Sequence, residues 1–263
     1  MSTRITEHDL GKIAAELTEH DRAIVAMLAA VKLANGNQLR RATLGDNSPA
    51  GQRAARRQLA RLLKWRVVAR LERRQGGLGR GSEAWTYALD VAGQRLVAAG
   101  RVHRPHLPGR PMWAHVLAGA EVYTRLAEAT RGTDRTLRLW QGEPASWRDF
   151  GGAAGETLKL KPDAFVAVAG PGYEDVCFVE VDTGSQSRTV IRAKLDAYRR
   201  YAATGLEQKT QDGVFPLTVF ITTTAARHAA LVDLVGELPT EVWSMFAVGQ
   251  VGDAARLLTG GAS

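Results

Sequence analysis

The segment from residue 49 to residue 65 constrains the fold of this 263-residue chain more than any other stretch. Ser48 and Pro49 are typical of a helix start, since a hydroxyl caps a helix and proline suits its first turn. Basic side chains recur with the helical period along one side: Arg53, Arg57, Arg61 and Lys64. Small and aliphatic side chains share the opposite side: Ala55, Leu59 and Leu62. The pattern predicts a helix that packs one side on a core and presents the other to an anion.

The segments around this helix are typical of a winged helix-turn-helix. Thr18 and Asp21 resemble a capping box, which indicates the start of a first helix. A glycine-rich basic stretch, residues 73–81, separates two short predicted strands. The expected elements are helices over about 18–35, 38–43, 49–65 and 92–99, and strands over 67–71 and 84–89. In such a fold the third helix enters the major groove of duplex DNA and the hairpin contacts the backbone or minor groove.

The polar residues of this domain supply the predicted DNA contacts. Early turns of the third helix are placed to contact base edges, for which arginine to guanine is the commonest specific pairing: Gln52, Arg53, Arg56 and Arg57. Further DNA contacts are predicted later on the helix, at Arg61 and Lys64. In the hairpin, the predicted phosphate contacts are Arg73, Arg74 and Arg80. The alternative for each arginine is a solvated charge. Residues 40–74 hold 11 basic and 2 acidic residues, whereas a solvated face would intersperse acids among its bases.

The distribution of charge assigns the anionic partner to the first half of the chain. Residues 1–105 hold 19 Lys and Arg against 9 Asp and Glu, and residues 106–263 hold 16 against 18. The sequence contains no run of eighteen apolar residues, the length needed to span a membrane. The acidic N-terminus does not resemble a signal peptide. Cys177 is the single cysteine, which excludes an internal disulfide and fits a reducing compartment. We therefore expect a cytoplasmic protein whose partner is double-stranded DNA.

Prolines divide the chain into two predicted domains. Three prolines within residues 105–111 interrupt any helix and indicate a linker. The predicted boundaries are a DNA-binding domain over 1–103, a linker over 104–111 and a second domain over 112–263. In the second domain we expect helices over about 112–129, 189–204 and 225–236, and strands over 137–140, 164–168, 176–181, 217–222 and 242–248. Paired strands followed by strand–helix alternation predict an α/β domain with a mixed sheet flanked by helices.

Three carboxylates are expected to converge at one end of a predicted hairpin. Asp163 opens its first strand, and Glu180 and Asp182 end the second strand on one face. Carboxylate oxygens are hard ligands that suit Mg²⁺ or Mn²⁺, and Asp163 and Glu180 are the predicted metal ligands. Such an ion could activate water and neutralise a phosphodiester. The alternative is that Glu180 and Asp182 are strand-end charges that reach solvent or pair with nearby arginines.

Lys194 is an unusual lysine because it falls on the apolar stripe of its predicted helix. Leu195, Tyr198 and Tyr201 share this stripe, which favours packing over a nucleophilic role for the two tyrosines. A lysine that faces a sheet is costly unless it meets an anion. We therefore predict that Lys194 reaches the carboxylates, the alternative being a side chain that snorkels to solvent.

These motifs resemble two related families. Pro162-Asp163 followed by Glu180-x-Asp182 resembles the PD-(D/E)XK nuclease core, except that Asp182 stands where the motif has lysine; Lys194 could substitute. The winged helix and the stretches 160–164, 178–184 and 192–198 resemble the replication-relaxation family of actinobacterial plasmids and integrative elements. That resemblance implies a restriction-endonuclease-like second domain and metal-dependent nicking or relaxation at a plasmid origin or transfer origin, with Asp163, Glu180, Asp182 and Lys194 as catalytic residues. The alternative is a non-catalytic initiator or regulator with a degenerate nuclease fold.

Overall fold

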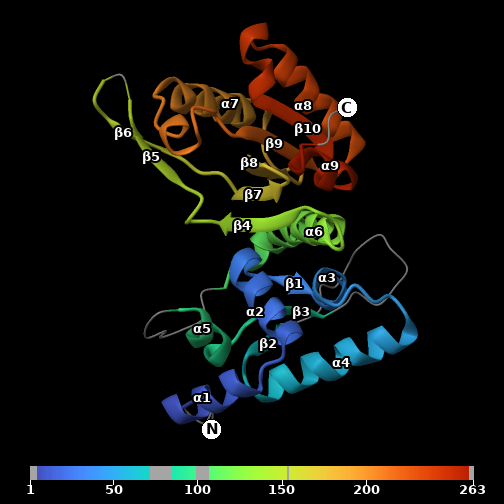
Figure 1. Ribbon diagram of the computed structural model, residues 1–263. Coiled ribbons are helices and arrows are strands. Elements are labelled where there is room, and N and C mark those ends of the chain that lie inside the picture. Colours follow the sequence, from blue (N-terminus) through green and yellow to red (C-terminus); the bar gives the residue numbers. More distant parts are fainter. Residues whose placement is uncertain (1–4, 72–84, 99–106, 153, 261–263) are drawn as a thin grey trace. The chain divides into compact units, whose positions relative to one another are not determined.

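The computed structural model describes residues 5–71, 85–98, 107–152 and 154–260, which divide into two compact units (Figure 1). The first unit is Met1–Thr124 and the second is Arg125–Ser263. The division falls within the helix α6 (Trp113–Thr130), whereas the sequence places the start of the second domain at residue 112.

The start of α6 packs with the first unit. The predicted linker, residues 104–111, lies partly outside the described residues, and Arg110–Met112 form a short 3-10 helix that leads directly into α6. Gln38 donates from Nε2 to the Leu117 carbonyl oxygen at 3.0 Å. Arg41 forms an ion pair with Glu121 at 2.8 Å. These contacts explain why the first unit ends later in the chain than proline content alone indicates.

Helices make up most of the first unit: α1 (Glu7–Glu16), α2 (Glu19–Val31), α3 (Gly36–Thr43), α4 (Pro49–Lys64) and α5 (Val91–Val97). All five begin at a side chain that accepts a backbone N–H, which satisfies a donor at the helix start: Thr6, Thr18, Asn35, Ser48 and Asp90. The predicted start of α2 and the predicted range of α4 are confirmed. Helix α1 was not predicted from the sequence. Ile13 is its one buried side chain, so the helix has no apolar periodicity.

A three-stranded antiparallel sheet completes the first unit. Its order is β1-β3-β2, with β1 (Ala34–Asn35), β2 (Val68–Leu71) and β3 (Thr86–Leu89). The first predicted helix was expected to continue to about residue 35, and this is wrong. Lys32 has a φ of 67°, which an α-helix of L-residues cannot continue, so α2 ends at Val31 and the chain forms β1.

The second unit is built on a five-stranded mixed sheet of order β10-β9-β8-β7-β4. Its strands are β4 (Thr136–Gly142), β7 (Ala164–Gly170), β8 (Tyr173–Asp182), β9 (Leu217–Thr222) and β10 (Phe246–Gln250). Strands β8, β9 and β10 are parallel to one another, and β7 pairs antiparallel with both β8 and β4. The predicted mixed sheet with flanking helices is confirmed. The last strand begins at Phe246 rather than 242, because Thr240–Met245 form a 3-10 helix.

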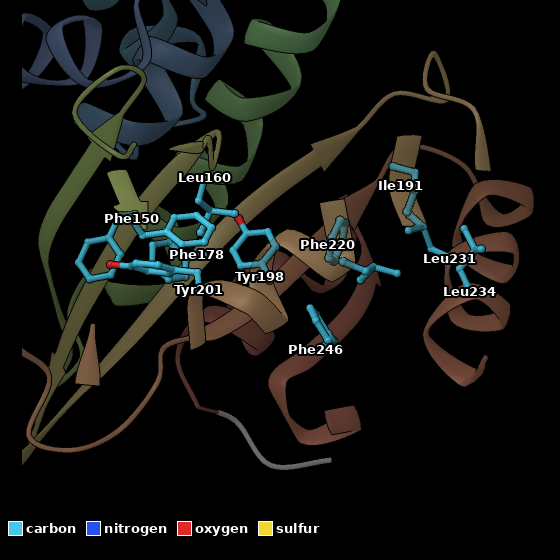
Figure 2. Close-up of a cluster of buried hydrophobic side chains, with 12 residues drawn as sticks. Phe150, Leu160, Phe178, Ile191, Tyr198, Tyr201, Phe220, Leu231, Leu234 and Phe246 are labelled. Atoms are coloured by element: carbon cyan, nitrogen blue, oxygen red, sulfur yellow. The ribbon is translucent and has the colours of Figure 1, made fainter. Parts of the chain in front are cut away.

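The core of this unit lies between one sheet face and the helices α7 (Arg188–Ala203) and α8 (Ala225–Gly236). Figure 2 shows Phe150, Phe178, Tyr198 and Tyr201 gathered in one part of this cluster. A short helix, α9 (Ala254–Leu258), packs against β8 and β9. Within the described ranges, no helix is long and apolar enough to cross a membrane.

A two-stranded hairpin that the sequence did not predict projects from this sheet (Figure 1). It pairs β5 (Arg148–Gly151) with β6 (Thr157–Leu160). Phe150 and Leu160 anchor the hairpin in the core. Its strands are too short and too polar for their alternation to stand out in the sequence.

Candidate functional site

The end of β8 places Glu180 beside α7. The side chain of Glu180 is 2% exposed, and both of its oxygens accept hydrogen bonds from this helix. Lys194 donates from Nζ to Oε2 at 2.5 Å, and Tyr198 donates from Oη to Oε1 at 2.7 Å. Lys194 and Tyr198 are four residues apart, so they lie one turn apart on one side of α7. The two donors therefore fix the orientation of a buried carboxylate.

Asp163 lies next to this carboxylate, just before β7. Its Oδ2 accepts the N–H of Val181, the residue after Glu180, at 2.7 Å. Burial raises the pKa of Glu180 to about 7, and the charge of Asp163 raises it too, although Lys194 and Tyr198 act in the opposite sense. Burial by itself would lower the pKa of Lys194, but the charges of Glu180 and Asp163 raise it overall. The structure thus brings two carboxylates and one ammonium together.

The third predicted carboxylate, Asp182, is held by another element. Its Oδ2 accepts a hydrogen bond from Nε of Arg227 on α8 at 2.8 Å, and its Oδ1 accepts the N–H of Gly184 at 2.6 Å. Arg227 also donates to the carbonyl oxygen of Gln186 at 2.7 Å. Asp182 therefore neutralises an arginine and holds the turn that leads into α7, a role that matches the alternative of an arginine partner.

The carboxylate oxygens of Asp163 and Glu180 are suitable ligands for a divalent cation, but two carboxylates do not complete its coordination shell. Within the described residues, no group of three or more His, Cys, Asp and Glu side chains is arranged to hold a metal ion. Mg²⁺ commonly keeps several waters and takes one or two carboxylates together with substrate phosphate oxygens. The donor set therefore suits a cation that is shared with a phosphate, and it does not suit a resident structural metal.

Helix α4 presents most of its predicted DNA contacts to solvent. Its buried side chains form the stripe expected from the sequence: Ala55, Leu59 and Leu62. The exposed members of the predicted contact set are Gln52, Arg53, Arg56, Arg57 and Lys64. The predicted hairpin contacts Arg73, Arg74 and Arg80 lie outside the described residues.

Arg61 differs from its neighbours on α4 because it has a partner within the first unit. Its guanidinium forms an ion pair with Asp21 on α2, and Asp21 is completely buried. Gln58 donates to the same carboxylate at 3.0 Å, and the N–H of Thr18 does so at 2.9 Å. These hydrogen bonds lower the pKa of Asp21 against the opposing effect of burial. Arg61 therefore joins α4 to α2 through this ion pair.

A second buried carboxylate, Glu207, was not found by sequence reasoning. It accepts a hydrogen bond from Nε of Arg148 at 2.8 Å and one from Oη of Tyr201 at 2.6 Å. Arg148 also lies over the ring of Phe165, 4.9 Å from its centroid. An isolated acid in a loop carries no pattern that marks it as buried, so only the tertiary contacts identify this pair.

The fold and the site define a two-unit α/β protein with an exposed basic helix in one unit and a buried acid–lysine site in the other. The chain matches the family described as replication-relaxation over residues 25–218 and therefore belongs to that family. The resemblance predicted from the sequence is confirmed, and the match extends from α2 to β9. No curated protein and no solved structure matches the chain. The family assignment supports a role in plasmid replication or relaxation.

Proposed function

We propose that this protein binds double-stranded plasmid DNA through its first unit and nicks it through its second. The observation that carries the proposal is the contact of Lys194 with Glu180 at 2.5 Å, beside Asp163. An ammonium beside two carboxylates is the combination that the PD-(D/E)XK resemblance implies. Plasmid DNA lies in the cytoplasm, so the proposed activity belongs there, at a plasmid origin or transfer origin.

Each residue of this site has a distinct proposed role. Asp163 and Glu180 would supply oxygen ligands to Mg²⁺ or Mn²⁺. Such an ion, when bound, activates water and neutralises charge on a phosphodiester. Lys194 would stabilise the negative charge that develops on the phosphate. Tyr198 would keep the carboxylate of Glu180 oriented, since its hydroxyl donates to Oε1. Asp182, where the nuclease motif has lysine, would hold the turn before α7 through Arg227.

The arrangement of the first unit supports a winged helix-turn-helix for DNA binding. Helices α2, α3 and α4 are followed by β2 and β3, which pair as a hairpin, and β1 joins the same sheet. In this fold α4 enters the major groove, where Gln52, Arg53, Arg56 and Arg57 would contact base edges and Lys64 would contact DNA further along the helix. The exposure of these five side chains leaves them available for DNA.

A second candidate function is that of a non-catalytic DNA-binding initiator or regulator. It is favoured by the hydrogen bonds that already engage both oxygens of Glu180 and by the ion pair of Asp182 with Arg227. In that case the acid–lysine pair would serve only to join β8 to α7.

Incubation of supercoiled plasmid carrying the cognate origin, with and without Mg²⁺ or Mn²⁺, separates the two candidates. We expect nicked circles that depend on the metal, and a loss of about 10²-fold or more in Lys194→Met, the usual effect of removing a charge-stabilising donor. Lys209→Met is the matched control, because Lys209 is exposed elsewhere in the same unit. Wild-type protein that binds this DNA but nicks none of it in either metal would favour the non-catalytic candidate.

A further inference from the structure

A basic and aromatic cluster lies next to the acid–lysine site in the second unit. We call it the Trp147 surface, and it consists of Trp147, Lys159 and Lys161. The Nζ atoms of Lys161 and Lys159 lie 4.9 Å and 5.6 Å from the centroid of the Trp147 ring. Both lysines are exposed. Cation–π attraction to the indole holds their ammonium groups on one part of the surface.

The loop that carries Trp147 is held firmly in place. Arg148 donates from Nη1 to the carbonyl oxygens of Ser146 at 2.9 Å and Trp147 at 3.3 Å. The same guanidinium is paired with the buried carboxylate of Glu207 at 2.8 Å. The indole N–H of Trp147 donates to Glu143 at 3.2 Å. The position of the Trp147 ring is therefore set by the protein itself before any ligand arrives.

The Trp147 surface is joined directly to Asp163. Lys161 and Asp163 are separated only by Pro162, in the short connection between β6 and β7. The buried hydroxyl of Ser146, the residue before Trp147, donates to the carbonyl oxygen of Pro162 at 2.6 Å. This hydrogen bond fixes the loop of Trp147 against the residue that precedes Asp163.

The two lysines are available to an anion. Lys161 makes no ion pair within the part of the chain that the structure describes. Lys159 pairs with Asp149 at 2.9 Å, but both side chains are exposed, and such pairs are weak and easily exchanged. DNA competes with this carboxylate for the ammonium groups, because neutralising several phosphates at once releases their condensed counterions.

We propose that the Trp147 surface binds the phosphate backbone of the DNA strand and positions it against Asp163. The ligand class rests on the proposed function, in which the second unit acts on DNA. Lysines that neutralise phosphates bind DNA without sequence preference, and an aromatic ring beside basic side chains is typical of sites that hold single strands. The surface thus complements α4, which is expected to determine where on the duplex the protein binds.

Amine-reactive footprinting of the full-length protein tests this position directly. The protein is acylated with and without a linear duplex fragment of random sequence, in EDTA, and each lysine is quantified by mass spectrometry. We expect DNA to protect Lys159, Lys161 and Lys64 on α4, and to leave Lys209 reactive. Protection of Lys64 without protection of Lys159 and Lys161 would overturn the proposal and leave DNA binding by the first unit intact. No protection of any lysine would reject DNA binding itself, and this proposal with it.

A salt titration measures the size of the effect. The combined variant Lys159→Ala and Lys161→Ala should lower the slope of log affinity against log salt by about 2, since each phosphate contact contributes about 0.9. Lys209→Ala removes one charge outside the surface and should leave the slope unchanged. Equal slopes for the combined variant and the wild type would show that these lysines do not contact phosphates. Because the measurement is made in EDTA, its result is independent of nicking.

Discussion

Replacing Tyr198 with phenylalanine isolates one hydrogen bond of the candidate site. The hydroxyl of Tyr198 donates to Oε1 of Glu180 at 2.7 Å, and the two side chains are 0% and 2% exposed. Phenylalanine keeps the ring that packs on Phe178, at 5.6 Å between centroids, so no large cavity forms. The carboxylate loses a donor that water cannot easily replace. Hydrogen bonds to charged groups contribute about 1.5–3 kcal/mol, so we expect a loss of this size when Glu180 is ionised.

The pH dependence of this loss follows from the pKa of Glu180. Burial raises this pKa to about 7, and the Tyr198 hydrogen bond lowers it because it favours the ionised form. Without the hydroxyl the pKa rises further. The lost stability is therefore largest above pH 7 and decreases as pH falls through the pKa. The difference between the two limits is about 1.4 kcal/mol for each unit by which the variant raises the pKa.

Hydrogen exchange of the β8 amides, measured near pH 8 and near pH 6, reports the stability of this unit by itself. The matched control is Tyr201→Phe, which removes the same hydroxyl from Glu207, at 2.6 Å. Glu207 forms an ion pair with Arg148 at 2.8 Å, so we expect the control to lose similar stability at both pH values. An equal loss for Tyr198→Phe at both pH values would refute the argument that Glu180 titrates near neutrality.

Three further predictions concern helix α4 and the acid–lysine site. Arg57→Ala should weaken duplex binding and lower its salt slope by about 0.9 if the residue contacts phosphate, whereas unchanged binding would remove it from the interface. Arg61→Ala should destabilise the first unit by about 1–3 kcal/mol at neutral pH, because buried Asp21 loses its counter-charge, and urea unfolding measures this. The pKa of Asp21 is lowered by folding, so this loss should shrink in acid, as pH falls from the ordinary aspartate value towards the lowered one. Mg²⁺ or Mn²⁺ should raise the melting temperature of the wild type but not of Asp163→Asn, and an equal rise in both would exclude Asp163 as a ligand.

The sequence by itself determined the elements whose pattern is local and periodic. Helix α4 was predicted from the separation of its basic and apolar faces, and it occupies the expected residues. Strand β9 and helix α8 also occupy the residues expected for them, 217–222 and 225–236. The position of Lys194 on an apolar stripe predicted an anionic partner, with snorkelling to solvent as the alternative, and Lys194 does contact Glu180 on β8. These predictions succeed because apolar periodicity and helix caps depend only on neighbours in the chain.

Only the tertiary structure decided which charged groups meet. Asp21 with Arg61 and Asp182 with Arg227 are 40 and 45 residues apart, and both carboxylates sit on elements whose polar positions offered several partners. Tyr198 was expected to pack, and its ring does, but its hydroxyl also holds Glu180. The sequence shows which face of a helix is buried, whereas the partner depends on the register and rotation of a second element. That register is fixed by packing of the whole core, so it cannot be obtained from either segment alone.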